Sequence, residues 1–292
     1  MQKTTKELTT IVQMPPTVFS KLGEFIHKNY GIKMPASKKV LLESRLQKRL
    51  KTLGMASYRE YVEYVFSPDG EDEIIQMIDL VTTNKTDFFR EPGHFEYLVN
   101  NALPDLIARR QCGLRKPLST WSAGCSTGDE PYTLAMVLTE FAASNPGFYF
   151  NILATDVSTR VLDIARNGTY NQEKIEPIPH ALRKKYLLRS KDPSKKVFRI
   201  APEIRRFVHF NKLNFMDRDF GIKNTIDIIF CRNVIIYFNR QTQEQLLNKF
   251  ARHLAPDGYL FMGHSETLTG LDVPFASVAP TVYRKTRLVD GL

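Results

Sequence analysis

A glycine-rich turn followed by two carboxylates is the feature of this chain that points most directly to chemistry. Residues 121–132 read Trp-Ser-Ala-Gly-Cys-Ser-Thr-Gly-Asp-Glu-Pro-Tyr, between an apolar run and a predicted helix. Glycine lacks a Cβ and tolerates positive φ, so a strand–turn–helix unit of this kind lets a ligand approach the backbone closely. A pyrophosphate would favour bare N–H groups at the helix start, whereas Asp129 and Glu130 favour an ammonium group and hydroxyls. Taken alone, the turn is also compatible with a purely structural role.

Polar residues also end two later apolar runs. Asp156 closes the run that starts at Asn151, and Arg232 and Asn233 follow the run that starts at Ile226. In a parallel sheet the ligand lies at the carboxyl ends of the strands, where an acid commonly accepts hydrogen bonds from ribose hydroxyls. S-adenosylmethionine has an ammonium group and ribose hydroxyls but no phosphate, so this pattern favours it as the ligand. The alternative role for Asp156 is to cap the helix that follows.

A third group of candidate residues lies in the segment 81–91, which is dense in hydroxyl, amide and charged side chains. Asn84 and Thr86 are placed to hydrogen-bond a ligand, and Arg90 suits a bidentate pair with a carboxylate. The alternative is an ordinary interdomain turn that uses Thr82 or Asn84 as a cap.

Three further positions are candidates for the same site. Tyr237, a few residues beyond the run that starts at Ile226, either projects into the site or belongs to the aromatic core. Asn214 and Phe215 follow another predicted strand and suit the edge and the face of an adenine ring. His264 is expected to be structural rather than catalytic, because no nucleophile–base pattern surrounds it.

The hydrophobic pattern predicts which elements position these residues. Strands and helices alternate through the second part of the chain, which predicts an α/β fold with a mainly parallel, Rossmann-like sheet and helices on both faces. Short strands at 195–200 and 206–210 predict a small β insertion at about 190–212. The remaining expected strands are 117–122, 149–155, 226–231, 258–263 and 275–284, and the expected helices are 95–110, 131–143, 158–166 and 241–254.

The first part of the chain has a different pattern. Residues 1–15 predict a flexible tail, and 16–80 predict an all-α helical domain. A linker that contributes to the active site is expected at 81–95, and the α/β domain at 96–292. Within the helical domain, the helix expected at 38–53 places Leu42, Leu46, Leu50 and Leu53 on one face, and the basic residues Arg45, Lys48 and Arg49 on an exposed neighbouring face.

Composition limits the class of protein. No apolar run approaches the roughly 18 residues of a membrane span, and no signal-peptide core is present, which predicts a cytoplasmic protein. The widely spaced Cys112, Cys125 and Cys231 predict neither disulfides nor a zinc site, and no metal site is expected. The net charge of +10 favours an acidic partner, and basic residues are concentrated at 33–51 and 183–206. Each of these stretches is either a contact surface or a solvated face.

Five motifs together resemble the chemotaxis receptor methyltransferase (CheR) family. They are TTNKTDFFRE (82–91), WSAGCSTGDEPYTLA (121–135), ATDVS (154–158), IFCRNVIIYF (229–238) and GYLFMGHSE (258–266), in this order and spacing. The resemblance covers about residues 16–285, including an N-terminal helical region that contains RLQKRLKTLG. The motif set is specific, although the glycine turn alone is not.

The resemblance implies methylation of glutamate side chains on chemoreceptors, with S-adenosylmethionine as methyl donor and S-adenosylhomocysteine as product. It assigns Arg90 and Tyr237 to the surroundings of the reacting centre. It also implies that the helix carrying Arg45, Lys48 and Arg49 meets the acidic methylation helices of the receptors. The implied cofactor set is Asn84, Thr86, Arg90, Glu130, Asp156, Asn214, Phe215, Cys231, Arg232 and Asn233.

One stretch departs from the family pattern. Some members have a glycine-rich loop in the β insertion that docks a pentapeptide at the receptor C-terminus, but residues 189–196 contain no glycine. Pentapeptide tethering is therefore in doubt. The implied setting is the cytoplasm, with recruitment to membrane-bound receptor arrays and without insertion into the membrane.

Two other functions are compatible with parts of the sequence. A nucleic-acid methyltransferase would use the net charge of +10, but no strand ends in the Asn/Asp-Pro-Pro-Tyr type of sequence used on flipped bases. A regulatory module would bind the cofactor or its product as a signal, but the matching Arg90 and Tyr237 argue for turnover. The sequence thus favours a protein-glutamate O-methyltransferase that does not act on nucleic acid.

Overall fold

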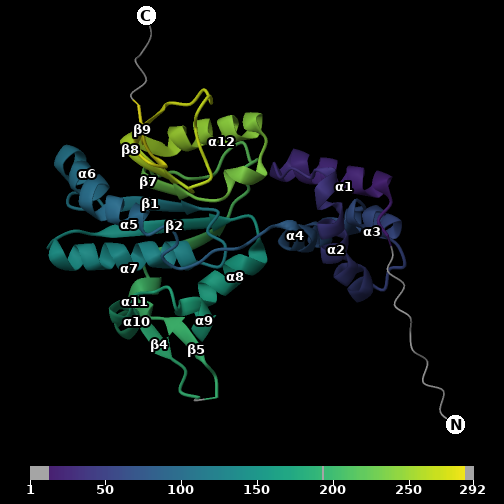
Figure 1. Cartoon of the computed structure of the whole chain (residues 1–292), viewed down its shortest axis with the longest axis horizontal. Helices are drawn as coiled ribbons and strands as arrows, with labels where there is room; N and C mark the ends of the chain where they lie inside the picture. Colours follow the sequence, from purple (N-terminus) through teal and green to yellow (C-terminus); the bar gives the residue numbers. More distant parts are fainter. Residues whose placement is uncertain (1–12, 193, 287–292) are drawn as a thin grey trace, which may run out of the picture. The chain divides into compact units, whose positions relative to one another are not determined.

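The computed structural model describes residues 13–192 and 194–286, so most of the tail expected at 1–15 lies outside the described residues. The chain divides into two compact units, with the boundary between Thr83 and Asn84. Figure 1 shows that the first unit is built of helices alone and that the second combines a central sheet with helices. The boundary falls within the segment predicted as a linker.

The first unit is held together by apolar helix faces. Leu42, Leu46 and Leu50 of one helix are buried, as their spacing predicts, and that helix ends at Gly54, which has a φ of 68°. Glycine takes this left-handed conformation without strain and so allows the chain to turn. The helices are α1 (Pro16–Tyr30), α2 (Lys39–Leu53), α3 (Tyr58–Val65) and α4 (Glu71–Val81), with the 3-10 turns η1 (Ala36–Lys38) and η2 (Pro68–Gly70).

The second unit contains a seven-stranded sheet with the order β6-β2-β1-β7-β8-β10-β9. The first five strands in this order run parallel, and β10 runs antiparallel to both of its neighbours. This arrangement confirms the predicted Rossmann-like α/β fold. The strands are β1 (Leu118–Ala123), β2 (Phe150–Asp156), β6 (Val208–Lys212), β7 (Ile226–Cys231), β8 (Leu254–Met262), β9 (Phe275–Ala279) and β10 (Val282–Lys285).

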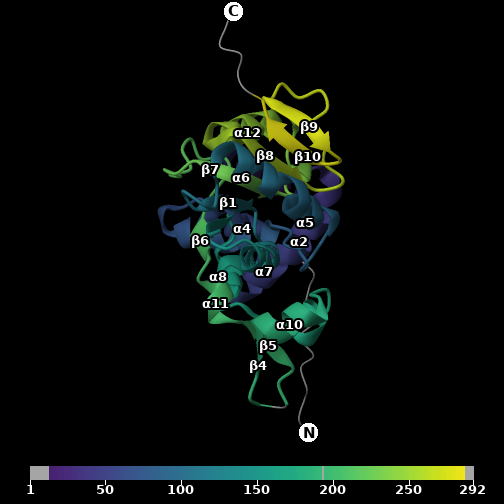
Figure 2. The same ribbon diagram turned by 90° about the vertical axis from the view of Figure 1, so that its left-hand side faces the viewer.

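Helices cover both faces of this sheet (Figures 1 and 2). On one face Tyr132 of α7 packs against Phe210 of β6, and on the other Trp121 of β1 packs against Phe250 of α12. The helix expected at 95–110 is α5 (Gly93–Tyr97), a π-helical turn η3 (Leu98–Ala102) and α6 (Leu103–Arg110). The others are α7 (Asp129–Ser144), α8 (Thr159–Asn167), α9 (Gln172–Ile175), α10 (His180–Tyr186), α11 (Pro202–Arg205), the 3-10 turn η4 (Ile235–Tyr237) and α12 (Arg240–His253).

The β insertion differs from its predicted position at about 190–212. Its three strands are β3 (Thr169–Asn171), β4 (Leu187–Arg189) and β5 (Val197–Ile200), in the order β3-β5-β4. The strand at 208–212, predicted to belong to the insertion, pairs in parallel with β2 in the main sheet. We therefore define the β insertion as residues 169–200.

The last predicted strand, 275–284, is also different in the structure. It is a hairpin of β9 and β10 that turns at Thr281, whose φ is 58°. The turn depends on a positive φ at a threonine, which the sequence pattern does not indicate, and for this reason the two strands were predicted as one.

Among residues 13–192 and 194–286, no helix combines the length and the apolar character that a membrane crossing requires.

Candidate active site

The carboxyl ends of β1, β2, β6, β7 and β8 lie along one edge of the sheet, because these strands are parallel. The glycine turn follows β1 at this edge. Gly124 and Cys125 donate their backbone N–H groups to the carbonyl of Thr155 at 2.8 and 2.9 Å, which attaches the turn to β2. Gly124 has a φ of 82°, and a Cβ there would come within 2.6 Å of Val234. The turn is therefore packed tightly between the end of β2 and the segment that follows β7.

Asp156 lies at the end of β2 and is 8% exposed. Its carboxylate accepts backbone hydrogen bonds from Ser126 in the glycine turn and from Ser158, both at 2.9 Å. The N-cap of α8 is Ser158, whose hydroxyl accepts from the Val161 N–H. The alternative in which Asp156 is the helix cap is thus not what the structure shows. Asp156 joins the turn to the end of β2 at the position expected for a ribose acceptor.

The two carboxylates at the start of α7 face different partners. Asp129 is fully buried, and one of its oxygens lies 2.8 Å from the Lys174 Nζ. Glu130 accepts a hydrogen bond from the Ser122 hydroxyl at 2.7 Å and lies 3.2 Å from an Arg232 nitrogen. Burial raises the pKa of Glu130, and the Arg232 charge opposes this shift. Glu130, rather than Asp129, belongs to the polar group at the strand ends.

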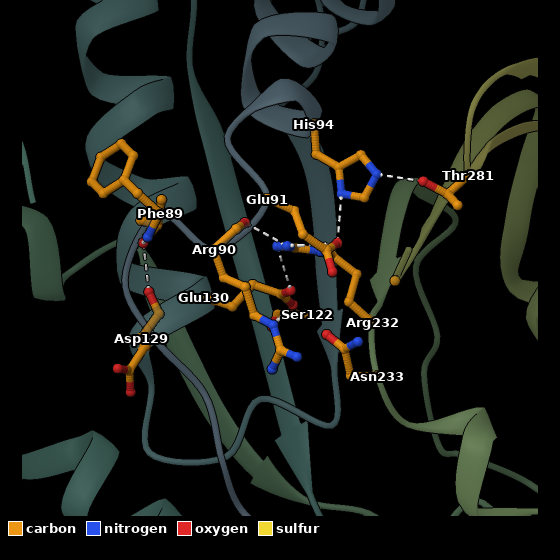
Figure 3. A network of polar contacts seen from close by, with 12 residues as sticks. Phe89, Arg90, Glu91, His94, Ser122, Asp129, Glu130, Arg232, Asn233 and Thr281 are labelled. Atoms are coloured by element: carbon orange, nitrogen blue, oxygen red, sulfur yellow. Dashed lines mark hydrogen bonds and ion pairs between the residues drawn. The ribbon is translucent and has the colours of Figure 1, made fainter. Parts of the chain in front are cut away.

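Arg232 is the centre of this polar network, drawn in Figure 3. Its side chain is 3% exposed and pairs with Glu130 and with Glu91, whose nearest oxygen lies 3.0 Å away. It also donates to the backbone carbonyl of Arg90 and lies over the ring of Phe95, 5.6 Å from the centroid. Arg232 thereby fixes the segment Arg90–Glu91 to the starts of α7 and α5.

The side chain of Arg90 points away from this network. Its backbone carbonyl is bound by Arg232, while its half-buried guanidinium donates to the Lys85 carbonyl at 3.3 Å. In Figure 3 the side chain extends toward the space between Asp129 and Asn233. Arg90 therefore presents a guanidinium at the same edge as Glu130.

Glu266 organises the segment that follows β7. Its buried carboxylate accepts four backbone hydrogen bonds, from Asn233, Val234, Ile235 and Gly263, at 2.7–2.9 Å. These bonds hold Asn233 at a φ of 59° and begin the 3-10 turn η4. Burial raises the pKa of Glu266, and the four N–H donors oppose this shift. Tyr237, which is half-buried, is the last residue of η4 and is thus positioned by this anchor.

The other predicted cofactor residues make contacts of different kinds. The Asn84 carbonyl accepts from the Ser126 hydroxyl at 2.9 Å, and the Thr86 carbonyl accepts from Lys174. The Asn214 side chain accepts from the Met216 N–H at 3.0 Å. Phe215 packs its ring against Phe250 and is half-buried, which leaves part of it accessible. Cys231 is fully buried, so only its backbone is available to a ligand.

A histidine pair lies beside the Arg232 network. His94 is 3% exposed, its Nδ1 lies 3.4 Å from Glu91, and its other ring nitrogen lies 2.8 Å from the Thr281 hydroxyl. Burial, together with the Arg232 charge, lowers the pKa of His94 to about 4, so this ring is neutral at pH 7. The side chain of His264 is exposed, and its backbone N–H donates to the Glu91 carboxylate at 3.3 Å.

Glu91, His94 and His264 bring potential metal-ligand atoms within 4.8 Å of one another. The Glu91 carboxylate, however, already accepts hydrogen bonds from Arg232, at 3.0 and 3.2 Å to one oxygen. The charge of this guanidinium opposes a second cation at the same oxygen. We therefore interpret Glu91, His94 and His264 as part of the polar network around Arg232 and not as a metal site.

The basic face predicted on α2 is not formed as expected. Arg49 makes a bidentate pair with Glu73, which is 3% exposed, at 2.9 and 2.5 Å. Arg45 donates to the carbonyls of Val81 and Thr82 at the end of α4, at 2.5 and 3.2 Å. Lys48 alone of the three is exposed. The prediction that all three lie on an exposed face was wrong, because a helix projection does not show which neighbouring helix contacts a charged side chain.

Sequence reasoning missed Glu91, Glu266 and Lys174 as organising residues of the site. Glu91 and Glu266 lie inside motifs that the sequence already singled out, but their partners are far away in the chain. Lys174 had no local signal, since a lysine in a short helix is usually solvated.

The polar side chains at this edge of the sheet fit S-adenosylmethionine. Carboxylates such as Glu130 and Asp156 accept hydrogen bonds from ammonium and ribose hydroxyl groups, and the Arg90 guanidinium matches a carboxylate. A phosphate group would be repelled by the same carboxylates. The residues present therefore suit a nucleoside with an amino-acid tail better than a nucleotide.

Comparison with known proteins agrees with this fit. Residues 84–284 match the family model described as CheR methyltransferase, SAM binding domain, and residues 17–82 match CheR methyltransferase, all-alpha domain. The chain is 40% identical to a chemotaxis protein methyltransferase of Borreliella burgdorferi, over 91% of this chain and 93% of that relative. It is 39% identical to chemotaxis protein methyltransferase 2 of Pseudomonas aeruginosa, over 91% of each. It is 34% identical to the chemotaxis protein methyltransferase of Escherichia coli, over 95% and 93%.

These matches span both units and include every motif that supplies the polar edge of the sheet. The chain therefore belongs to the CheR methyltransferase family, and its second unit is a methyltransferase domain that binds S-adenosylmethionine.

Proposed function

We propose that this protein transfers a methyl group from S-adenosylmethionine to glutamate side chains of chemoreceptors, forming methyl esters in sensory adaptation. The observation that supports the proposal is the polar edge of the sheet in a CheR-family domain. Asp156 ends β2 there, and Arg232 pairs with Glu130 and binds the backbone of Arg90. The relatives named as chemotaxis protein methyltransferases support the receptor as substrate. The place of action is accordingly a membrane-bound receptor array.

The proposed reaction requires no general base. A glutamate carboxylate with a pKa of about 4.3 is already ionised at pH 7 and has a free oxygen lone pair. S-adenosylmethionine supplies an electrophilic methyl group on a sulfonium sulfur, so that the products are a carboxylate methyl ester and S-adenosylhomocysteine. The task left to the protein is to align the two reactants and to exclude water.

Each residue of the site then has a role within this task. Glu130 holds the ammonium group of the cofactor, and Asp156 holds the ribose hydroxyls. Asn214 and Phe215 contact the adenine ring at its edge and face. Asn84, Thr86, Cys231, Arg232 and Asn233 complete the cofactor set, with Thr86 and Cys231 acting through their backbone and Arg232 through the polar network.

Two residues act near the reacting centre. The Arg90 guanidinium orients a carboxylate, either that of the substrate or that of the cofactor. Tyr237 packs beside the transferred methyl group, at the end of a turn that Glu266 holds rigid. Fixed geometry of this kind is worth more than acid–base chemistry in a reaction whose nucleophile is already charged.

The receptor surface is proposed to include α2, with Lys48 as an exposed charge on it. Arg45 and Arg49 contribute to this surface mainly by holding α2 against α4. The β insertion carries basic residues near its strands β4 and β5, but its loop contains no glycine, so a receptor-tail tether is not part of the proposal.

The experiment that tests this function is a methyl-transfer assay with a receptor cytoplasmic fragment. S-adenosylmethionine with a labelled methyl group is incubated with the protein and either the receptor fragment, RNA or DNA. We expect label in the receptor alone, as a base-labile ester. Transfer to RNA or DNA would favour a nucleic-acid methyltransferase instead. Binding of S-adenosylhomocysteine without turnover on any substrate would favour a regulatory module.

A further inference from the structure

Lys174 connects three parts of the methyltransferase domain that are distant in sequence. It lies in α9, within the β insertion, and its Nζ is 2.8 Å from Asp129 at the start of α7. The same Nζ lies 3.3 Å from the Asp87 carboxylate and donates to the backbone carbonyl of Thr86. One ammonium group therefore joins the insertion, the helix that follows the glycine turn, and the linker.

The Asp129 end of this contact is rigid. Asp129 is fully buried and accepts a hydrogen bond from the Thr127 hydroxyl at 2.6 Å. Burial raises its pKa, and the Lys174 charge is the first of the effects that lower it again. A buried carboxylate of this kind needs its countercharge, so Lys174 is held in place by Asp129. The ammonium group is then available to fix the Thr86 backbone.

Tyr170 provides a second contact from the same insertion. Its hydroxyl donates to the Thr127 carbonyl at 2.6 Å, and its ring lies edge-on to Phe88 of the linker at 5.0 Å. A Cβ on Gly128 would come within 2.9 Å of this hydroxyl, so the close approach requires glycine. The start of the insertion thus contacts both the glycine turn and the linker.

We propose that Lys174 is a positioning residue for cofactor binding. By holding the Thr86 backbone against the start of α7, it fixes linker residues 84–91 in the conformation that presents Asn84 and Arg90. This inference rests on the proposed assignment of those linker residues to the cofactor. It gives the β insertion a role in the cofactor site itself, independent of any receptor tail.

The test separates this role from simple charge compensation of Asp129. The variants are K174M, the double variant D129N/K174M, and the conservative variant K174R. Lys185 supplies a matched control, because it also joins the insertion to α7, through an exposed pair with Glu140 at 2.8 Å. Each variant is assayed for S-adenosylhomocysteine affinity by calorimetry, for its melting temperature, and for amide hydrogen exchange of residues 84–91 without ligand.

K174M should weaken S-adenosylhomocysteine binding by about tenfold, the effect of losing a charge-assisted hydrogen bond. It should also speed exchange of the linker amides and lower the melting temperature. In D129N/K174M the melting temperature should recover, because no unpaired buried charge remains, while weak binding and fast exchange persist. K174R should largely preserve binding, and K185M should behave as the wild type.

Recovery of affinity together with melting temperature in the double variant would overturn the inference, since Lys174 would then only neutralise Asp129. Unchanged affinity and exchange in K174M would overturn it as well. A wild-type protein that fails to bind S-adenosylhomocysteine would instead contradict the cofactor assignment, and the ligand-free exchange would still test the contact between Lys174 and the linker.

Discussion

Asp156 at the end of β2 has a structural task, visible in its contacts, and a proposed task in cofactor binding. Its carboxylate accepts the backbone N–H groups of Ser126 and Ser158, and we propose that it also accepts hydrogen bonds from the ribose hydroxyls of the cofactor. D156A should therefore weaken S-adenosylhomocysteine binding by about 1–3 kcal/mol, the range for leaving a buried hydrogen-bonding group without its partner. It should also lower the melting temperature, because two buried N–H groups lose their acceptor.

Calorimetry measures the first effect, and thermal unfolding measures the second. Asp163 offers a matched control in the following helix, where it is 75% exposed, so D163A should alter neither quantity. A folded D156A protein with wild-type affinity would remove Asp156 from the cofactor set.

Arg90 and Tyr237 should respond differently to substitution. R90A removes the guanidinium at the strand ends and should depress methyl-ester formation and cofactor affinity together. Y237F keeps the ring and should lower kcat by about tenfold while cofactor affinity stays largely intact, the pattern of a contact made at the reacting centre. Steady-state kinetics with receptor fragment and calorimetry with S-adenosylhomocysteine distinguish the two. Full activity of R90A would show that the linker is only a structural turn.

His94 makes the folded state sensitive to acid. Its pKa is lowered from an ordinary 6.5 to about 4, mainly by burial, so between these values the unfolded chain binds a proton that the folded chain does not. Stability contributed by the neutral ring is therefore complete above pH 6.5 and is lost as the pH falls toward 4. The loss is on the order of 3 kcal/mol. H94Q should show a smaller fall in unfolding free energy over this range, and an equal fall in both proteins would exclude His94 as the cause.

The basic residues of helix α2 are of two kinds: some pair with groups inside the first unit, and others face solvent. Arg49 is paired with the buried Glu73, so R49E should destabilise the first unit by about 3–5 kcal/mol, the cost of leaving a buried charge without a partner. K48E changes an exposed charge. It should raise the apparent KM for receptor while leaving the melting temperature and cofactor affinity unchanged.

The effect of K48E should shrink as ionic strength rises, because salt screens an exposed charge. Glu63 is exposed on α3 and supplies a control position, so E63K should leave the receptor KM unchanged or lower it. If K48E has no effect on receptor kinetics at low salt, α2 is a solvated face and the receptor contact lies elsewhere.

The elements themselves were predictable where the apolar pattern was local and continuous. The buried run at 226–231 is a strand with the same bounds in the structure, and Gly54 ends α2 as expected. The strand at 208–212 was assigned to the wrong sheet, because its partner β2 lies about fifty residues earlier and no local signal shows the pairing. The hairpin at Thr281 was missed for a related reason, since a threonine with positive φ is an uncommon turn residue.

At the scale of the whole molecule, the site depends on contacts between segments that are far apart in the chain. The sequence indicated which strand ends carry polar groups, because a parallel sheet brings such ends to one edge. It did not indicate that Arg232 pairs with Glu91 and Glu130, or that Glu266 holds the turn before Tyr237. Such pairings are set by tertiary packing, which single-residue patterns do not encode.

Contacts between distant segments also explain why the net charge of +10 did not indicate where the site lies. Several of the cations, including Arg49, Lys174 and Arg232, are used inside the fold to pair with buried carboxylates. Each such pair removes one cation and one anion, so it leaves the net charge unchanged but takes basic residues away from the surface. Acidic partners are therefore better sought at particular exposed residues such as Lys48.

The proposed reaction of this protein is the formation of methyl esters on receptor glutamates. The most direct measurement is mass spectrometry of a receptor cytoplasmic fragment after incubation with the protein and S-adenosylmethionine bearing a deuterated methyl group. We predict deuterated methyl groups on glutamate side chains, lost on mild base treatment and strongly reduced with R90A. Base-stable label on lysine or arginine, or no label on the receptor while the protein binds S-adenosylhomocysteine, would contradict it.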